Sequence, residues 1–593
     1  MGEAFRKGFS PADAGLLEAL FIGERSHVDD RTMELFQKTG TLHLLAVSGF
    51  NVGFVYLGVL LLLRLLPAPR IAKSAMILAS IWAYCLIVGW QAPVVRASVM
   101  ASMFLIGDAL GRRTDPLNTL GLAALVILAV RPAEVFDAGF QLSFLAVCGI
   151  VAATPVFYKP PKPLPFEKWS WRERAGIYVI GLFWVSFAAT LFTLPVTLQR
   201  FYTIAPLAPL VNVLVIPAVT VLFFLGAAYL ALAVSFGALW AAWPAKGLIV
   251  GLLAVLRGAE AIPGGYLITG RLGAPFWAAL VGGIAFLLLT KRLRRAWRRA
   301  GWIVALVAAV LIAQAAWRGL HREFRVLFFD VGQGDAAYVE FPGGRNLLVD
   351  AGNGGSGDDG RWVITPYLKS IGVSRIDTVA VSHAQEDHAG GLATVLREFK
   401  VGRIIEGDGP YPVSGYGDLG RRIRAEGAET LPLSRGGKVP GLPADAVVLN
   451  PRPGSTADIN EGSLVLRMKY ASQGVLFTGD IGDKAIPDML TSDLALDADV
   501  LKVPHHGGRA GEAAWEFFRA VNPRFSVVSA GERNSYGHPA AETLRALEAV
   551  PGNRVFRTDR DGAIECKFNG DTFLCEPAVP GRPGPYGTYK KHK

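Results

Sequence analysis

Histidine and aspartate side chains gather where apolar, strand-like runs of this sequence end. Residues 379–399, VAVSHAQEDHAGGLATVLREF, place two histidines and two acidic residues within six positions directly after an apolar run. Three later runs end in a similar way, in LFTGD, LKVPHH and SYGHP. The candidate metal ligands are His383, Asp387, His388, Asp480, His505 and His538, with Gln385 and His506 as further candidates. Imidazole nitrogens and carboxylate oxygens bind divalent metals such as Zn²⁺ and Mn²⁺, so the pattern predicts one or two ions.

Such a cluster would support hydrolysis. Two ions about 3.5–4 Å apart, bridged by one carboxylate, activate a water and stabilise the leaving oxygen of a phosphate ester. A single histidine at the end of a strand is usually structural, but clusters at four strand ends favour a metal site. We expect Asp335 and Asp350, which also follow apolar runs, to orient ligands or cap turns.

Short β-rich runs and glycine-rich turns alternate after Gly319, with helical stretches between them. The helical stretches are 388–399, 417–426, 483–492, 511–520 and 539–549. In layered α/β folds the carboxyl ends of the strands share one edge, where residues distant in sequence converge. The second half of the chain is therefore predicted to be an α/β domain that assembles the candidate ligands at one edge.

The first half of the chain has the composition of a membrane domain. The 593 residues are 51% hydrophobic and 18% charged, with a mean hydropathy of +0.35. Ten apolar runs are visible, at 42–66, 71–90, 93–111, 117–131, 139–157, 174–198, 205–235, 245–262, 274–290 and 301–317. A span needs roughly 20 apolar residues. The runs 117–131, 245–262 and 301–317 are short or interrupted, so we expect them to be tilted, re-entrant or interfacial.

Basic segments indicate how these runs cross the membrane, because cytoplasmic loops carry an excess of lysine and arginine. The basic segments are 111–115, 159–174 and 291–299. If all three are cytoplasmic, residues 1–41 and everything after Trp317 lie outside the cytoplasm. If one weak run does not cross, the C-terminal half lies on the other side.

Some apolar runs contain residues that suit a polar passage better than lipid. Arg96, Asn212 and Gln141 lie within or at the start of such runs, and Asn212 is surrounded by three prolines that we expect to break its helix. The alternatives are an arginine that reaches water at the membrane surface and ordinary polar packing between helices. The net charge of +11 fits nucleic acid or lipid headgroups, or only the bias of cytoplasmic loops.

Two of the four cysteines can indicate on which side of the membrane the C-terminal half lies. If Gly570 and Asp571 form a two-residue turn, Cys566 and Cys575 face each other across a hairpin. A disulfide there would need an oxidising compartment, whereas two unpaired thiols would carry no such information. We expect Cys85 and Cys148, within the apolar runs, to be packing residues.

The sequence resembles a known family in both halves. SHAQEDHAGG, LFTGD, LKVPHHGG and SYGHP resemble the motifs of a metallo-β-lactamase-like domain, and FFDVGQGDAAYV and LLVDAG resemble its first strands. GTLHLLAVSGFNVGFV, GRRTDPLNTLGLAALVI, FDAGFQLSFLAV and PLAPLVNVLVIPAV resemble the membrane domain of the ComEC competence family. The order of the two halves also matches that family, and the resemblance covers most of the chain.

The resemblance implies a polytopic α-helical membrane domain followed by an αββα metallo-β-lactamase-like domain. It divides the chain into 1–41, an amphipathic segment; 42–319, the channel; 320–577, the hydrolase domain; and 578–593, a disordered tail. Family members usually begin with further spans and an OB-fold domain, of which residues 1–41 resemble only the last part.

The function that the resemblance implies is uptake of DNA through the cytoplasmic membrane in natural transformation. Single-stranded DNA would pass through the channel, and the outer domain would degrade the other strand with Mn²⁺ or Zn²⁺. The expected catalytic residues are Asp387, His388, Asp480 and His505, with Lys502 and Arg509 on DNA phosphates and Arg96, Asn212 and Gln141 in the channel. The family also implies a DNA receptor and a cytoplasmic translocation motor as partners, beside membrane lipid.

The chain departs from the family pattern at one ligand position. Hydrolases of this type read H-x-H-x-D-H and competence proteins often H-x-D-x-D-H, but here Gln385 occupies the third position. A neutral amide oxygen is a weak ligand. NEGSLVL, 460–466, stands where hydrolases carry another histidine. Two alternatives therefore remain: an outer domain that binds DNA without cleaving it, or a membrane-tethered hydrolase of a small ester.

Overall fold

A computed structural model describes most of the chain in two compact units. The described residues are 2–45, 49–67, 69–111, 115–161, 169–289, 293–320, 322–415, 417–455, 457–509, 511–568 and 573–578. The units are Met1–Leu311 and Ile312–Lys593, and each is described by itself. Parts of the three basic segments, the predicted turn at 570–571 and all but the first residue of the predicted tail lie outside the described residues.

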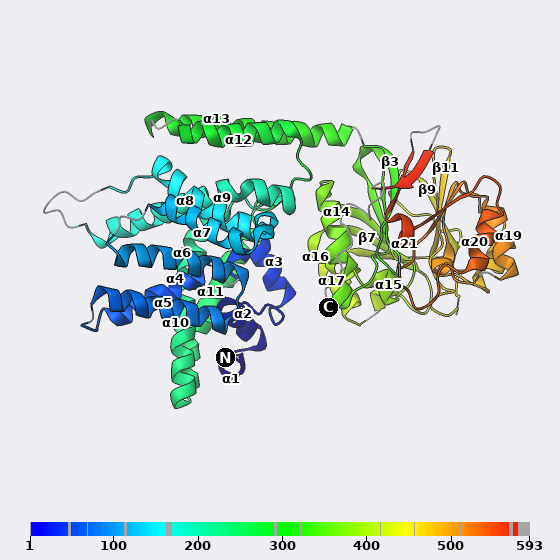
Figure 1. The fold of residues 1–593 in the computed structure, drawn as a ribbon. Helices are drawn as coiled ribbons and strands as arrows, with labels where there is room; N and C mark the ends of the chain where they lie inside the picture. The colour runs from blue at the N-terminus through cyan, green and yellow to red at the C-terminus, as the bar shows by residue number, and fades with distance from the viewer. Residues whose placement is uncertain are drawn as a thin grey trace. The chain divides into compact units, whose positions relative to one another are not determined.

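Ten helices of the chain fall on the ten predicted apolar runs (Figure 1). They are α4 (Gly49–Leu63), α5 (Arg70–Ile87), α6 (Ala92–Ala109), α7 (Pro116–Val130), α8 (Ala138–Phe157), α9 (Trp171–Arg200), α10 (Ala208–Phe236), α11 (Trp243–Glu260), α12 (Ala274–Leu289) and α13 (Leu293–Leu320). Apolar side chains on several faces of these helices point outward, as expected of helices that face lipid. The predicted helical membrane region is confirmed at this level.

Five described segments are long and apolar enough to cross a membrane: Ala92–Ala109, Ala138–Phe157, Trp171–Arg200, Ala208–Phe236 and Leu239–Glu260. The run 245–262, predicted to be weak, belongs to the last of these. Helix α7 has only 15 residues, which span about 22 Å at 1.5 Å per residue, so this run is short as predicted.

Helix α10 is not broken as predicted. It continues through Pro217 without interruption, and Pro209 lies in its first turn, where a missing backbone N–H leaves no hydrogen bond unmade. Inside a membrane helix, packing against neighbours makes an interior proline tolerable. Here α10 packs against α9 and α11, and Asn212 Nδ2 donates to Ser186 Oγ on α9 at 2.8 Å.

Three short helices at the start of the chain pack on this region. They are α1 (Gly2–Gly8), α2 (Pro11–Ile22) and α3 (Asp30–Lys38). The ring of Phe21 stacks on Phe223 of α10 with 4.4 Å between centroids, and Tyr229 Oη donates to the carbonyl of Ala4 at 2.8 Å. Residues of the predicted amphipathic segment thus share one apolar core with α10 and α11.

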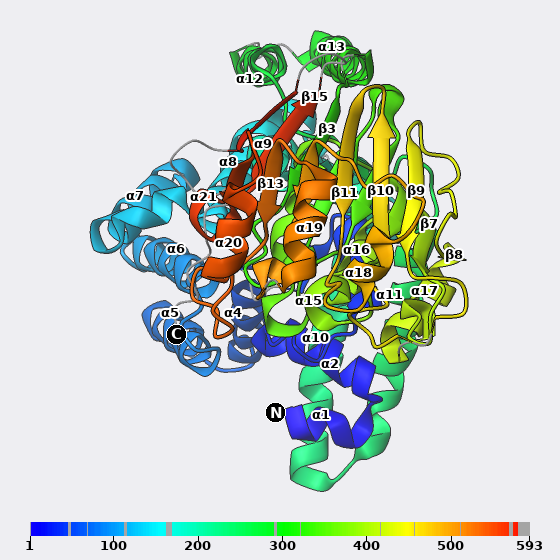
Figure 2. The same ribbon diagram turned by 90° about the vertical axis from the view of Figure 1, so that its right-hand side faces the viewer.

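The second unit contains two sheets that face each other across an apolar core (Figure 2). The eight-stranded sheet has the order β16-β15-β3-β4-β5-β6-β7-β8 and the six-stranded sheet the order β14-β13-β12-β11-β10-β9. The strands are β3 (Phe324–Phe328), β4 (Ala337–Glu340), β5 (Asn346–Val349), β6 (Arg375–Ala380), β7 (Lys400–Gly407), β8 (Glu429–Leu433), β9 (Asp445–Asn450), β10 (Val465–Tyr470), β11 (Gln473–Phe477), β12 (Val500–Lys502), β13 (Phe525–Val528), β14 (Arg554–Arg557), β15 (Ile564–Phe568) and β16 (Phe573–Pro577).

Helices cover the outer faces of both sheets, which gives the predicted αββα arrangement (Figure 1). They are α14 (Thr365–Ser370), α15 (Glu386–Ala389), α16 (Leu392–Glu398), α17 (Gly417–Glu426), α18 (Ala485–Leu490), α19 (Glu512–Val521), α20 (Ala541–Glu548) and α21 (Thr558–Asp561). Each of the five predicted helical stretches overlaps one of them. In α19 the apolar positions Phe517, Phe518 and Val521 are buried, so the helix packs one face onto the six-stranded sheet.

Strands β5, β6 and β7 run parallel in one sheet, and β11 to β14 run parallel in the other. Their carboxyl ends carry the loops with the candidate ligands. At the far edge of the larger sheet, β15 and β16 are antiparallel and place Cys566 opposite Cys575. The two cysteines form a disulfide, so the predicted pairing is present and the alternative of two free thiols is not.

Candidate metal centre

The carboxyl ends of strands from both sheets bring four acidic or imidazole side chains together in the interior. Asp335, His388, Asp480 and His506 each offer a ligand atom, and these atoms all lie within 4.8 Å of one another. Each of the four side chains is almost fully buried. Asp335 precedes β4, His388 lies on α15 after β6, Asp480 follows β11 and His506 follows β12. The predicted convergence of distant residues at one edge is therefore seen in the structure.

The hydrogen bonds of two histidines fix which ring nitrogen is free. His388 Nδ1 lies 3.0 Å from Asp350 Oδ2, and His506 Nδ1 lies 3.1 Å from the carbonyl oxygen of Ser529. Both partners only accept hydrogen bonds, so each Nδ1 must carry the proton. The lone pairs of His388 Nε2 and His506 Nε2 then point away from these partners. This is the arrangement that orients a metal-binding histidine.

Those lone pairs face carboxylate oxygens. His388 Nε2 lies 3.3 Å from Asp480 Oδ1, and His506 Nε2 lies 3.5 Å from Asp480 Oδ2 and 3.3 Å from Asp387 Oδ2. Two acceptors at such distances repel each other unless a proton or a metal ion lies between them. Both Nε2 atoms and Asp480 Oδ1 are buried, with no hydrogen-bond partner among the described residues. The donor set therefore fits a divalent cation.

The charge state of the acidic groups also suits a cation. Burial raises the pKa of Asp480, but the neighbouring His388 and His506 outweigh this effect and hold the pKa well below its ordinary value. Burial likewise raises the pKa of Asp387, but the neighbouring His506 and His388 outweigh this effect and lower it. Both carboxylates are thus ionised at neutral pH.

His383 stands beside this group as a neutral imidazole. Its Nδ1 lies 3.0 Å from Ser382 Oγ, and its buried Nε2 has no hydrogen-bond partner in the described part of the chain. Burial, together with the nearby His388, lowers the pKa of His383 to about 4. Neutral imidazole is the form that binds metals, and the role of His383 as a ligand stays a prediction.

Asp335 lies on the opposite edges of the two inner histidines. Its oxygens are 3.7 Å from His388 Nδ1 and from His506 Nδ1, the nitrogens that already carry protons. Asp335 therefore faces the protonated edges of the rings rather than their lone pairs, and its role in orienting ligands stays a prediction. On the lone-pair side we expect Asp387 to complete the ligand set with His388, Asp480 and His506.

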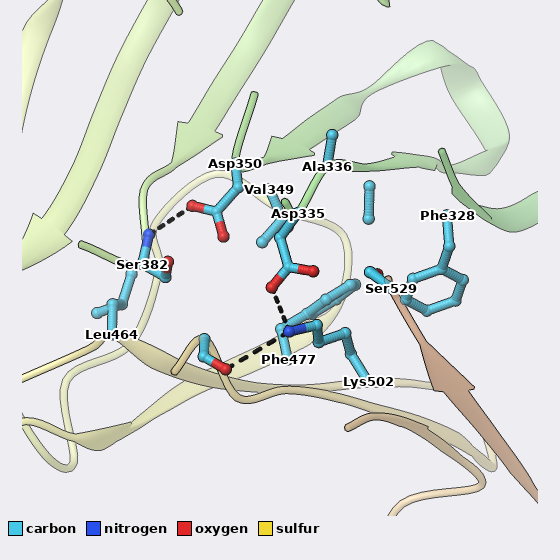
Figure 3. A pocket seen from close by; sticks show the side chains of 12 residues that line it. Phe328, Asp335, Ala336, Val349, Asp350, Ser382, Leu464, Phe477, Lys502 and Ser529 are labelled. Atoms are coloured by element: carbon cyan, nitrogen blue, oxygen red, sulfur yellow. Dashed lines mark hydrogen bonds and ion pairs between the residues drawn. The ribbon is translucent and has the colours of Figure 1, made fainter. Parts of the chain in front are cut away.

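Lys502 lies buried beneath the centre, where its Nζ contacts Asp335 Oδ2 (Figure 3). Burial lowers the pKa of Lys502, but Asp335 and Asp480 outweigh this effect and raise it, so the side chain is charged. A buried ammonium does not reach a DNA strand in solvent. The predicted contact between Lys502 and a DNA phosphate has no support from this position, whereas Arg509 is exposed on the loop after His506.

The two histidines of the LKVPHH motif point in different directions. Both have a positive φ, 47° for His505 and 53° for His506, a conformation that is uncommon for residues other than glycine. The turn buries His506 and leaves the His505 side chain 47% exposed, with Nε2 4.0 Å from Asp480 Oδ2. We predicted His505 as the ligand and His506 as a further candidate, but the structure brings His506 closer to the carboxylates.

His538 lies at the outer side of the centre, with its ring centroid 5.8 Å from that of His505. Asn534 Oδ1 accepts a hydrogen bond from its backbone N–H at 2.9 Å, which anchors the loop. The exposed His505 and the half-buried His538 thus lie next to the buried ligands. From this position they can contact a substrate more readily than an ion held by the inner group.

The side-chain amide of Gln385 makes a hydrogen bond to another side chain. Its Nε2 donates a hydrogen bond to Asn460 Oδ1 at 2.6 Å. Asn460 begins the segment that stands where related hydrolases carry a further histidine. The two positions that depart from the hydrolase pattern are therefore in contact with each other.

The residues predicted to line a channel have protein partners in the first unit. Arg96 is buried on α6, and its Nη1 lies 3.3 Å from Glu134 and 3.6 Å from Asp137. Gln141 Nε2 donates to the carbonyl of Val135 at 2.9 Å, and Asn212 is buried against Ser186. Their proposed place in a DNA passage stays a prediction.

Both halves of the chain match known protein families. Residues 20–295 match the family described as Competence protein, and residues 329–522 match the Metallo-beta-lactamase superfamily. The chain belongs to the ComEC/ComA family of competence proteins. The recognition made from the sequence motifs is therefore confirmed, and this competence protein carries the metallo-β-lactamase domain that its second unit displays.

Relatives of this competence protein come from several bacteria. It is 28% identical to "ComE operon protein 3" of Bacillus subtilis, over 95% of this chain and 73% of that protein. It is 28% identical to "Competence protein ComA" of Neisseria gonorrhoeae, over 93% of this chain and 74% of the relative. It is 24% identical to "Recombination protein 2" of Haemophilus influenzae, over 95% and 73% of the two chains.

Proposed function

We propose that this competence protein carries single-stranded DNA across the cytoplasmic membrane in natural transformation, and that its second unit cleaves the strand that stays outside. The observation that carries the cleavage is the set of buried acceptors around Asp480, joined in one chain to the apolar helices of a competence protein. The relatives named for competence and recombination support DNA as the partner. A DNA receptor and a cytoplasmic motor remain proposed partners.

The side chains of the centre have defined roles in this proposal. His388, His506, Asp387 and Asp480 would hold a divalent ion, which when bound supplies a Lewis acid and lowers the pKa of a water. Asp350, Ser529 and Asp335 hold the two inner rings in place. The exposed His505 and the half-buried His538 would donate hydrogen bonds to the phosphate or protonate the leaving oxygen.

Cleavage is tested with the purified full chain in lipid nanodiscs, Mn²⁺ and end-labelled single- and double-stranded DNA. We expect cleavage that disappears with a chelator and in an Asp387→Ala/His388→Ala variant, because both side chains face the ion position. Cells that carry this variant should still take up labelled DNA if transport and cleavage are separate steps.

A second candidate is a domain that binds DNA without cleaving it. The Gln385–Asn460 hydrogen bond favours it, since both residues depart from the hydrolase pattern. If the folded parent chain shifts labelled DNA in a gel but cleaves none with Mn²⁺, Zn²⁺ or Mg²⁺, the cleavage proposal fails and this candidate replaces it. Cleavage of a small phosphodiester but of no DNA would instead indicate a tethered esterase.

The proposed orientation places the second unit outside the cytoplasm. The disulfide between Cys566 and Cys575 supports it, because such bonds persist in oxidising compartments. The helix bounds add a further basic connection, between α4 and α5, with Arg64, Arg70 and Lys73. Counting from the three predicted cytoplasmic segments puts this connection on the cytoplasmic side as well, in agreement with the positive-inside rule.

Labelling of single cysteines tests the orientation. In a Cys85→Ala/Cys148→Ala background, a membrane-impermeant maleimide added to spheroplasts should label Lys438→Cys, whose native lysine is exposed in the second unit. It should not label Lys159→Cys, in the connection between α8 and α9, until the membrane is permeabilised. The reverse pattern would place the metal centre in the cytoplasm and contradict the proposal.

A further inference from the structure

The two sides of the candidate centre differ in their chemistry. On one side, two imidazole nitrogens and two carboxylates face one another: His388, His506, Asp387 and Asp480. On the other side, near His383, Gln385 occupies a ligand position of the family pattern, and it bonds to Asn460, in the segment where hydrolases carry a further histidine. A pair of ions needs strong donors on both sides, because each ion takes at least three protein ligands.

The hydrogen bond between the two amides commits the Asn460 oxygen, and Gln385 then offers only a neutral amide oxygen. Gln385 Nε2 donates to Asn460 Oδ1 at 2.6 Å, so the Asn460 oxygen already has a donor. The nearby hydroxyl of Ser463 is also committed, since its oxygen accepts the backbone N–H of Asp480 at 3.1 Å. On this side His383 Nε2 is a strong ligand atom, beside these neutral groups. Neutral amides are poor ligands for Zn²⁺ and modest ones for Mn²⁺.

A positive charge is also built into the protein at this centre. Lys502 is buried with its Nζ against Asp335, and its Nζ lies 3.5 Å from the carbonyl oxygen of Gly479, next to Asp480 (Figure 3). Buried carboxylates need compensating charge. Lys502 supplies part of the compensation that a second ion would otherwise bring, and a second divalent ion would add charge to a site that already holds a cation.

We propose that this centre binds a single divalent ion, held by His388, His506, Asp387 and Asp480, and that the Gln385–Asn460 amide pair takes the place of a second ion. The amide N–H groups not used in the pair would donate hydrogen bonds to a non-bridging phosphate oxygen of the substrate. This inference rests on the proposed metal-dependent function of the centre, but counting ions does not require that the protein cleaves anything.

The experiment counts ions on the full chain in nanodiscs. The chain is stripped with a chelator, equilibrated with Mn²⁺ or Zn²⁺ and freed of unbound metal, and its metal content is measured by plasma mass spectrometry. We expect about one ion per chain, and a Mn²⁺ paramagnetic resonance spectrum without the exchange coupling of two ions that share a carboxylate. An Asp387→Ala/His388→Ala variant should bind none.

A restored ligand gives the sharper comparison. Gln385→His puts an imidazole at the position of the amide and breaks the pair with Asn460, so the metal content should rise toward two ions per chain, with exchange coupling in the Mn²⁺ spectrum. Gln385→Leu breaks the same pair without adding a ligand and should stay near one ion. Hydrogen exchange of β6 and β11 confirms that both variants are folded.

Each result decides the proposal. Two coupled ions in the parent chain would overturn it, and so would no bound ion. One ion in both the parent and the folded Gln385→His variant would show that the amide pair does not occupy a second ion position. One ion in the parent without DNA cleavage would support the single-ion centre while the proposed nuclease function fails.

Discussion

Replacing Asp480 with asparagine is expected to lower metal-dependent DNA cleavage by on the order of 10³-fold or more and to remove most of the bound ion. Asp480 is the carboxylate that both inner histidines face, at 3.3 and 3.5 Å, and its two oxygens serve different rings. An amide is neutral and offers only one acceptor oxygen. Loss of the charge stabilisation that an ion supplies amounts to several kcal/mol, and every 1.36 kcal/mol is a factor of ten in rate.

The measurement compares initial cleavage rates and metal content of the two purified proteins at equal Mn²⁺. Asp483→Asn is the matched control, because Asp483 lies on the same loop, is exposed and undergoes the same chemical change. It should retain the parent's rate and metal content. If the Asp480→Asn protein keeps the parent's cleavage rate and metal content, Asp480 does not bind the ion.

Replacing Lys502 with methionine is expected to destabilise the second unit by about 3–5 kcal/mol, the usual cost of leaving one member of a buried ion pair uncompensated. The change removes the ammonium that contacts Asp335 and leaves that carboxylate buried, close to Asp350 and Asp480. The effect should be largest in the metal-free protein, because a bound ion would supply part of the missing positive charge. Hydrogen exchange of β11, β12 and β13 measures the loss within the full chain.

Two further variants separate charge from packing. Lys438→Met removes a lysine that pairs with Asp445 at 3.1 Å on the surface, and we expect less than about 1 kcal/mol because exposed pairs contribute little. Adding Asp335→Asn to Lys502→Met removes the uncompensated charge and should recover part of the lost stability. If Lys502→Met costs no more than Lys438→Met, Lys502 does not neutralise Asp335.

The fold of this protein was largely predictable because its apolar patterns are long or regular. All ten apolar runs became helices, since runs of this length have no other way to satisfy their backbone in lipid. The break expected at Pro217 did not occur, because the cost of an interior proline depends on the neighbours of α10, which the local sequence does not show. The strand ends predicted the edge where the ligands meet, but not the contacts made there.

Within the centre, prediction failed where a turn or a distant partner decides which way a side chain points. Two adjacent histidines are equivalent in the sequence, and only the positive φ at both positions turns His506 inward and His505 outward. Lys502 follows an apolar run, and we predicted that it contacts DNA at the surface. It is buried instead, because it pairs with Asp335, which lies 167 positions earlier. The departure at Gln385 was visible in the motif, whereas its hydrogen bond to Asn460 connects residues 75 positions apart.

The packing of the first helices has a consequence for how the chain is made. Ala4 bonds to Tyr229, which follows it by 225 residues, so the start of the chain must wait for its partner to be synthesised. At about 5–20 residues per second the delay is roughly 10–45 seconds. During that time the buried faces of α1 and α2, with Phe5, Leu17 and Phe21, have no α10 to cover them. We expect a chaperone or the lipid surface to shield α1 and α2 until α10 is synthesised.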